Sequence, residues 1–133
     1  MNMPVNQGVN NVLFIKDNNN VLSIAYDDLI KYHGRVLIGG VALAFKALEL
    51  SFVTLLPHEI PSREKITSFL TGLGEAGMGV IDGVEMVTRV RTRGLLIADT
   101  EAVLNRLAPD APNGGKYYFE LVYDDKKIEL TLK

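Results

Sequence analysis

Two predicted β-hairpins, one near each end of the chain, constrain the fold more than any other feature of this sequence. At the amino end, the β-favouring runs 12–16 and 21–26 flank Asp17-Asn18-Asn19-Asn20, residues that tolerate the left-handed backbone of a tight turn. At the carboxyl end, the runs 117–123 and 127–133 alternate across Asp124-Asp125-Lys126, with Ile128, Leu130 and Leu132 on one face. Because hairpins pair antiparallel, the pattern argues against a doubly wound parallel sheet.

The segment between the hairpins has mixed helical and extended patterns. We first expect a short helix capped by Asp27 or Asp28 and ended by Gly34, then a helix from Val41 with Gly39-Gly40 at its start, and a strand over 51–56. A helix should follow Pro61-Ser62, carrying Ile66, Phe69, Leu70 and Leu73, and a glycine-rich stretch should come after it. The last elements before the second hairpin are a helix opened by a capping box of Asp82 and Glu85, a strand over 93–98, and a short helix after Asp99 or Thr100. The order predicts an α+β fold: helix, strand and helix followed by strands in a mixed, partly antiparallel sheet, with an N-terminal hairpin.

Length and composition bound the class of protein. The chain has 133 residues with no linker or repeat, which predicts one domain, 1–133. It has no cysteine, which removes thiolate metal sites and cysteine nucleophiles and fits a reducing compartment, so we expect a cytoplasmic protein. A net charge of −2 gives no reason to expect nucleic-acid binding. The apolar stretch 36–56 contains Lys46 and Glu49, so we expect no membrane span.

Residues 72–77, Gly-Leu-Gly-Glu-Ala-Gly, match the glycine pattern of dinucleotide-binding loops. That chemistry needs a strand before the loop and a helix after it. Since the preceding segment has helical spacing, the sequence favours a helix end followed by a flexible loop, and a dinucleotide site is rejected.

Histidines and arginines supply the remaining candidates. His33 and His58 lack the spacing of a metal-binding motif, so a structural or exposed role is the more typical interpretation for each. Arg89, Arg91 and Arg93 alternate, and in an extended segment their side chains would share one side of the backbone. Two interpretations stay open for them: a solvated face paired with acidic residues, or an anion site.

Tyr32-His33-Gly34-Arg35-Val36-Leu37-Ile38-Gly39 is similar to a known motif. It resembles the first block of the formylmethanofuran dehydrogenase E-like family, an aromatic-His-Gly-His-x-Cys-Pro-Gly segment leading into a helix of small residues. Residues 82–91 resemble that family's second block, Asp-Ala-Ile-Gln-x-x-Thr-Gly-Cys-Thr, and a Gly-Lys-Tyr-Tyr-Phe strand follows at 115–119. The likeness covers roughly residues 26–133, leaving 1–25 as an N-terminal arm and hairpin.

The chain departs from the family at the positions that resemble metal ligands. His33 remains, but Arg35 stands at the second histidine, Leu37 at the first-block cysteine and Val90 at the second-block cysteine. Leucine and valine cannot ligate a metal, and a guanidinium does not deprotonate at neutral pH. We therefore expect the family's metal site to be lost, with no metal and no cofactor in its place.

The resemblance implies that the His33 loop and the segment 88–91 lie close together. Arg35, Thr88, Arg89 and Arg91 would then surround the position of the lost metal and form a cationic site for a small anionic metabolite, the leading functional hypothesis. Two alternatives stay open: a non-catalytic subunit or interaction module with a filled site, and a metal-independent enzyme using His33 as general acid–base. Whether the protein is an enzyme is left undecided, and a homodimer is expected as a possible assembly.

Overall fold

The computed structural model describes residues 3–36, 38–112 and 114–132, and it has the α+β class that the sequence predicts. Strands β1 (Val12–Asp17) and β2 (Asn20–Ala25) form an antiparallel hairpin. A second sheet has the order β4-β3-β5-β6. Its strands are β3 (Ile66–Thr71), β4 (Leu96–Ala98), β5 (Tyr118–Tyr123) and β6 (Lys126–Thr131), with β4 parallel to β3 and the other neighbours antiparallel.

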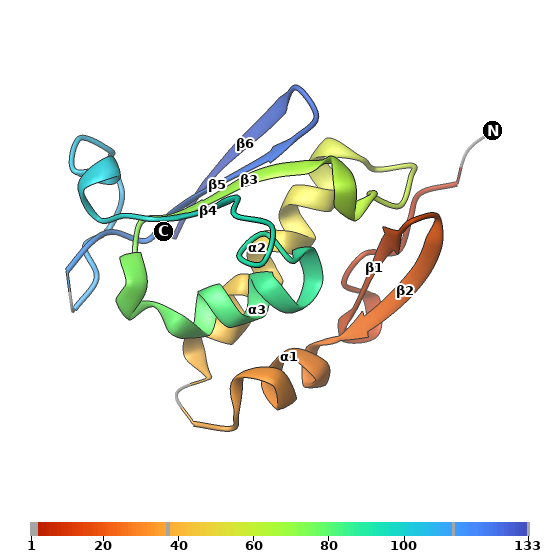
Figure 1. Cartoon of the computed structure of the whole chain (residues 1–133), viewed down its shortest axis with the longest axis horizontal. Helices are drawn as coiled ribbons and strands as arrows, with labels where there is room; N and C mark the ends of the chain where they lie inside the picture. The colour runs from red at the N-terminus through yellow and green to blue at the C-terminus, as the bar shows by residue number, and fades with distance from the viewer. Residues whose placement is uncertain (1–2, 37, 113, 133) are drawn as a thin grey trace.

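Three α-helices lie on one side of the larger sheet, as Figure 1 shows: α1 (Tyr26–His33), α2 (Gly39–Leu55) and α3 (Met78–Thr88). Helices α2 and α3 contact this sheet, and α1 packs against α2, α3 and β2. Four short 3-10 turns, Val9–Asn11, Arg63–Lys65, Gly74–Ala76 and Glu101–Val103, complete the described elements. None of the helices in the described ranges has the length and apolar character needed to cross a bilayer.

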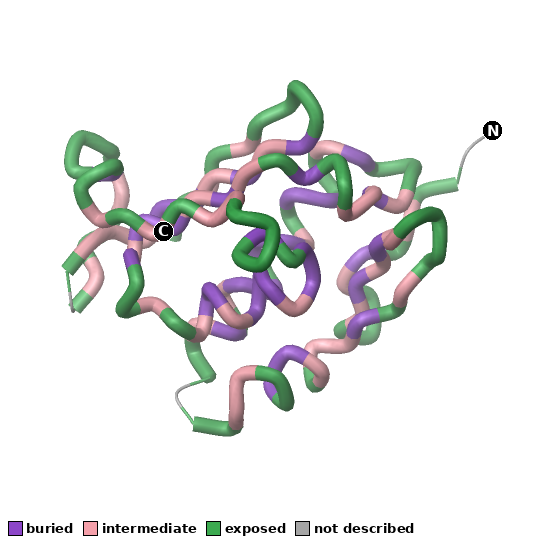
Figure 2. The backbone as a smooth tube through the Cα atoms, in the orientation of Figure 1, coloured by how far each residue is buried: buried purple, intermediate pink, exposed green. Residues whose placement is uncertain are grey.

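One hydrophobic core joins the two sheets and the helices. Phe119, Leu121 and Tyr123 of β5 face the core, where the helices contribute Val41, Leu48 and Val84, all fully buried. Figure 2 shows the buried backbone gathered where α2, α3 and the sheet meet, while the hairpin turns are exposed. The described chain is therefore a single compact α+β domain.

Local turn chemistry explains the predictions that are confirmed. Asn18 and Asn19 both adopt positive φ, 48° and 71°, which is the two-residue turn that the asparagine run predicts. Gly34, with φ of 101°, ends α1 as predicted. Neither Asp27 nor Asp28 is the N-cap, because α1 begins at Tyr26; Asp28 instead lies in the first turn and accepts the N–H of Ala25.

The predicted strand over 51–56 is wrong. Residues 51–55 are the last turns of α2, whose buried positions Val41, Leu48 and Phe52 keep helical spacing to the end. Ser51 donates its hydroxyl hydrogen to the carbonyl of Ala47, which satisfies a polar group inside the core.

The predicted helix after Pro61-Ser62 is also wrong, since that segment forms β3. The pairing of β3 with β5 has a register irregularity between Ile66 and Ser68. A bulge interrupts the alternation of a strand, so the buried residues Ile66 and Phe69 fall three apart, as they would in a helix.

The capping box at Asp82 and Glu85 does not exist, because α3 begins four residues earlier at Met78. The predicted strand over 93–98 is shorter than expected and consists of β4 alone. Residues 89–93 form a turn after α3, closed by a bond from the Arg93 N–H to the Arg89 carbonyl. The arginines at 89–93 therefore do not alternate along an extended segment. The short helix predicted after Asp99 is a 3-10 turn, and the Asp99 carboxylate accepts the N–H of Glu101.

Candidate functional site

A cavity of about 900 Å³ opens beside the end of α1 and the beginnings of α2 and α3, which lie together on the left of Figure 1. Its walls are mostly apolar, and the described residues that line it include no aspartate, glutamate, lysine or arginine. They are His33, Gly34, Val36, Gly39, Gly40, Leu43, Leu73, Ala76, Gly77, Met78, Gly79, Ala111, Pro112, Gly114, Tyr117 and Leu132. A cavity of this size and polarity is typical of small-molecule sites.

His33 lines the cavity, and its imidazole is held in place by a charged partner, Asp82. Its Nδ1 lies 2.7 Å from Oδ2 of Asp82, and the two side chains are only 12% and 20% exposed. His33 is the last residue of α1, and Asp82 lies in the second turn of α3. The packing of α1 on α3 thus joins two residues 49 apart in the sequence. With Nδ1 committed to Asp82, Nε2 is the polar ring atom left to a ligand.

Two helix beginnings meet in the same wall. A Cβ built on Gly40 would lie 3.0 Å from the Gly79 Cα and from the Val80 nitrogen, so the backbones of α2 and α3 touch where both residues are glycine. Among the described residues, the backbone bonds nearest these ends run from the Ala42 N–H to the Ile38 carbonyl and from the Ile81 N–H to the Gly77 carbonyl. The preceding amides have no partner within their own helices, and residues of both helix starts, Gly40 and Gly79 among them, line the cavity, so the positive ends of two helix dipoles lie at its wall.

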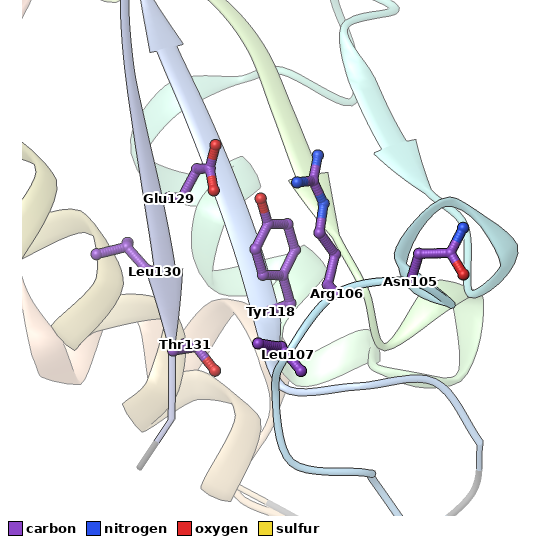
Figure 3. Close-up of a pocket in the computed structure, with 7 residues that line it drawn as sticks. All are labelled: Asn105, Arg106, Leu107, Tyr118, Glu129, Leu130 and Thr131. Atoms are coloured by element: carbon purple, nitrogen blue, oxygen red, sulfur yellow. The ribbon is translucent and has the colours of Figure 1, made fainter.

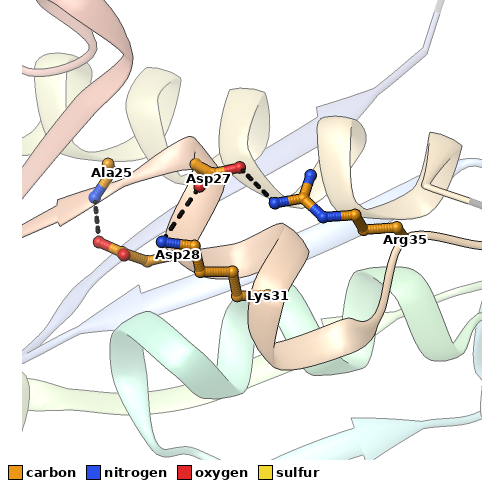
Figure 4. A network of polar contacts seen from close by, with 5 residues as sticks. All are labelled: Ala25, Asp27, Asp28, Lys31 and Arg35. Atoms are coloured by element: carbon orange, nitrogen blue, oxygen red, sulfur yellow. Dashed lines mark hydrogen bonds and ion pairs between the residues drawn. The ribbon is translucent and has the colours of Figure 1, made fainter.

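Arg35, predicted as a ligand-binding residue, lies outside the cavity wall. Its guanidinium is exposed and lies 3.3 Å from the carboxylate of Asp27, as Figure 4 shows. Asp27 also accepts a bond from Lys31, and the two cations hold the pKa of that carboxyl below its ordinary value.

Thr88, Arg89 and Arg91 lie at the carboxyl end of α3, about 15 Å along the helix from the amino end that lines the cavity. The Thr88 hydroxyl is buried and donates to the Val84 carbonyl. Arg89 ends the helix in a left-handed conformation, and both Arg89 and Arg91 are exposed. The described structure therefore does not bring these residues together with His33. Leu37, the first-block position of the resemblance, lies outside the described residues, and Val90 is buried in the core.

The glycine-rich loop 72–77 has both flanking elements that a dinucleotide site requires, since β3 precedes it and α3 follows. The sequence-based argument against such a site, that a helix precedes the loop, is therefore wrong. Two of its glycines nevertheless serve the chain itself. A Cβ on Gly72 would lie 2.8 Å from the Lys116 carbonyl oxygen, and Gly74, with φ of 67°, would place a Cβ 2.8 Å from the Thr100 methyl group. Of the loop glycines Gly72, Gly74 and Gly77, only Gly77 lines the cavity.

Sequence reasoning missed Asp82 as the partner of His33, because its spacing from Glu85 resembles a capping box. It also missed the apolar lining from Leu43, Leu73 and Tyr117. The resemblance contained one usable signal, the retention of both His33 and Asp82 in the two matching blocks.

A second cavity, of about 440 Å³, lies on the face of the sheet opposite the helices and is shown in Figure 3. Tyr118 donates its hydroxyl hydrogen to Glu120 at 2.6 Å, and the Arg106 guanidinium lies 5.2 Å above the Tyr118 ring. Lys127 and Arg106 both pair with Glu120, at 3.2 and 3.5 Å. The charged groups here already neutralise one another, so this cavity is the weaker candidate for a ligand.

Among the described residues, no three histidine, aspartate or glutamate side chains are grouped closely enough to hold a metal ion. No family model, no curated protein and no solved structure matches the chain.

Proposed function

We propose that the protein binds a small carboxylic acid with an apolar body in the cavity beside His33. The observation that carries the proposal is the cavity itself, an apolar space of about 900 Å³ whose described lining contains one imidazole, held in place by a carboxylate. Burial of an apolar chain contributes roughly 25 cal/mol per Å². In its protonated form the imidazole donates to the carboxylate through Nε2, and the positive ends of the α2 and α3 dipoles favour an anion in the cavity.

The likeness of residues 26–133 to the formylmethanofuran dehydrogenase E-like family is part of this proposal. The contact between His33 and Asp82 supports it, since each residue belongs to one of the two matching blocks. An anionic ligand is retained from the sequence-based hypothesis, but its donors are no longer arginines. The open cavity favours a binding protein over a subunit whose site is filled by packing.

Ligand binding is tested by thermal unfolding with straight-chain carboxylates from butanoate to decanoate, with the matching alcohols as comparison. We expect the unfolding temperature to rise with carboxylate concentration, by an amount equivalent to about 2.7 kcal/mol at one hundred times the dissociation constant. The alcohols should stabilise less, because they lack the charge.

The matched variants are Ala76→Phe and Ala102→Phe. Both alanines are exposed members of 3-10 turns, but only Ala76 lines the cavity. Ala76→Phe should abolish the stabilisation and Ala102→Phe should keep it. Two outcomes contradict the proposal: the carboxylates stabilise both variants equally, or no carboxylate stabilises the original protein.

We also propose that the protein acts in the cytoplasm as a homodimer. Leu50 and Val53, on the outer face of α2, are 46% and 45% exposed, and an apolar surface of this kind favours self-association. Light scattering of the purified chain would show a mass twice that of the monomer; a monomer at micromolar concentration contradicts the homodimer.

A further inference from the structure

We propose that His33 is a general base that hydrolyses carboxylic esters bound in the cavity, with Asp82 as the residue that positions it. The inference rests on the proposed function, since the same cavity that binds a carboxylic acid would hold its ester. It goes further by assigning a reaction to the His33–Asp82 pair.

The pair has the arrangement that makes an imidazole a directed base. The Asp82 carboxylate accepts the Nδ1 hydrogen at 2.7 Å, which fixes the tautomer and leaves the lone pair on Nε2. Both side chains are largely buried, so the ring has little freedom to turn. His33 lines the cavity, so a molecule held there can reach the ring.

In the proposed reaction the attacking group is water, activated by His33. Among the described lining residues there is no serine, threonine, cysteine or lysine that could form an acyl intermediate. Nε2 of His33 takes a proton from water as the water oxygen bonds to the acyl carbon, and the carbonyl electron pair moves to oxygen. When the tetrahedral intermediate collapses, the bond from carbon to the alcohol oxygen breaks and His33 returns the proton to the leaving oxygen. The products are an alcohol and a carboxylic acid, which ionises, and no further reactant is required.

The charge on the tetrahedral oxygen needs donors, and backbone amides can provide them. The beginnings of α2 and α3 meet at Gly40 and Gly79, both of which line the cavity, beside His33. Such preorganised donors contribute a large share of the acceleration in acyl transfer. The apolar walls formed by Leu43, Leu73 and Met78 would hold the acyl chain, which predicts a preference for medium-length acids.

The experiment measures hydrolysis of 4-nitrophenyl esters from acetate to decanoate by the full chain, compared with free imidazole at the same concentration. We expect kcat/KM to exceed the imidazole rate constant and to rise with chain length. In His33→Gln it should fall on the order of 100-fold or more, as expected for loss of a general base. His58→Gln is the matched control, because His58 is exposed and is not part of the described lining, and should hydrolyse like the original protein.

Asp82→Asn separates positioning from structure. It should lower kcat with little change in KM, because the amide no longer fixes the Nδ1 tautomer. It should also shift the lower limb of the pH–rate profile, because the negative charge beside the imidazole is lost. A purely structural Asp82 would leave the profile in place.

Two further measurements keep the outcome decisive. If His33→Gln does not fold, Ala76→Phe against Ala102→Phe tests the same cavity, and only Ala76→Phe should lose hydrolysis. Octanoate stabilisation is measured on the same samples. Stabilisation without hydrolysis above the imidazole rate overturns the catalytic inference and leaves the binding function standing. Hydrolysis that survives in His33→Gln overturns it as well.

Discussion

Two charged side chains near the end of α3, Glu85 and Arg93, bind backbone groups of the chain itself. Glu85, 5% exposed, accepts the N–H groups of Arg91 and Thr92 and so closes the turn that follows α3. Arg93 donates to three carbonyls, those of Arg63, Glu64 and Ile66. Arg93, one of the three alternating arginines, therefore has a structural role that satisfies backbone acceptors near the start of β3.

Glu120 is the carboxylate for which we predict a pH effect on stability. Burial alone would raise its pKa, but hydrogen bonds from Tyr118 and Lys127, with the nearby Arg106, lower the pKa below the ordinary glutamate value. A carboxyl whose pKa is lower in the folded than in the unfolded chain stabilises the fold above the ordinary value, and this stabilisation is lost as pH falls through the folded pKa.

Glu120→Gln should therefore destabilise the protein at pH 7, on the order of 1–2 kcal/mol for the loss of charged hydrogen bonds. The difference from the original protein should narrow as the pH is lowered below about 4. Urea denaturation at several pH values measures this difference in the free energy of unfolding. Glu101→Gln, at an exposed residue, is the control. A difference that stays constant from pH 7 to pH 3 would show that the ion pairs of Glu120 contribute nothing.

At the scale of elements, the contact between α2 and α3 is built from small residues. Gly40 touches Gly79, and a Cβ on Gly83 would lie 2.6 Å from the Cβ of Ala44. The close approach brings both helix beginnings into the cavity wall and allows α3 to place Asp82 against His33.

We predict that Gly83→Ala destabilises the fold by about 1–3 kcal/mol, because the added methyl group must push two packed helices apart. Gly39→Ala is the control, since a Cβ there meets nothing within 4 Å and alanine favours a helix over glycine. Chemical denaturation compares the two. If Gly83→Ala were as stable as Gly39→Ala, the helix contact would be looser than its geometry requires.

How much of these elements the sequence predicts depends on whether the signal is local. The hairpin turn at Asn18-Asn19 and the stop at Gly34 follow from the conformations of those residues alone, and both predictions are confirmed. Strand β3 was missed because the irregularity after Ile66 gives a strand the burial spacing of a helix. The pairing of β3 with β5 also fixes its conformation, and that partner lies about fifty residues along the chain.

The candidate site follows the same rule. The resemblance identified His33, but its contact with Asp82 depends on how α1 packs on α3, across 49 residues. The expected cluster of Arg35, Arg89 and Arg91 came from the resemblance, which implied that the His33 loop and residues 88–91 lie close together, but Arg89 lies at the opposite end of α3 from the cavity. Spacing in the sequence could therefore suggest which residues were candidates, but tertiary packing decided which of them meet.

At the scale of the whole molecule, the N-terminal hairpin shares the core with the remaining elements. Leu13 and Ile15 of β1 are fully buried in the same cluster as Leu29, Leu48 and Val87. A backbone bond from the Lys16 N–H to the Pro61 carbonyl, at 2.8 Å, ties β1 to the segment before β3. The hairpin should not unfold separately, because a two-stranded hairpin is marginal on its own.

We predict one cooperative unfolding transition that includes the hairpin. Leu13→Ala should lower the free energy of unfolding of the whole domain by about 2–5 kcal/mol, the range for a buried leucine truncated to alanine. Val21→Ala, at a β2 residue that is 52% exposed, is the control and should cost far less. Far-ultraviolet circular dichroism, which reports helices, and near-ultraviolet signals of the five tyrosines should give coincident transitions in both variants.

In hydrogen exchange, the slowest amides of β1 and β3 should open with the same free energy, and both opening free energies should fall together in Leu13→Ala. If only the β1 amides lost protection, the hairpin would be a separable unit that merely rests on the helices. Since α1 follows β2 directly in the chain, the position of His33 would then depend on whether that hairpin is docked.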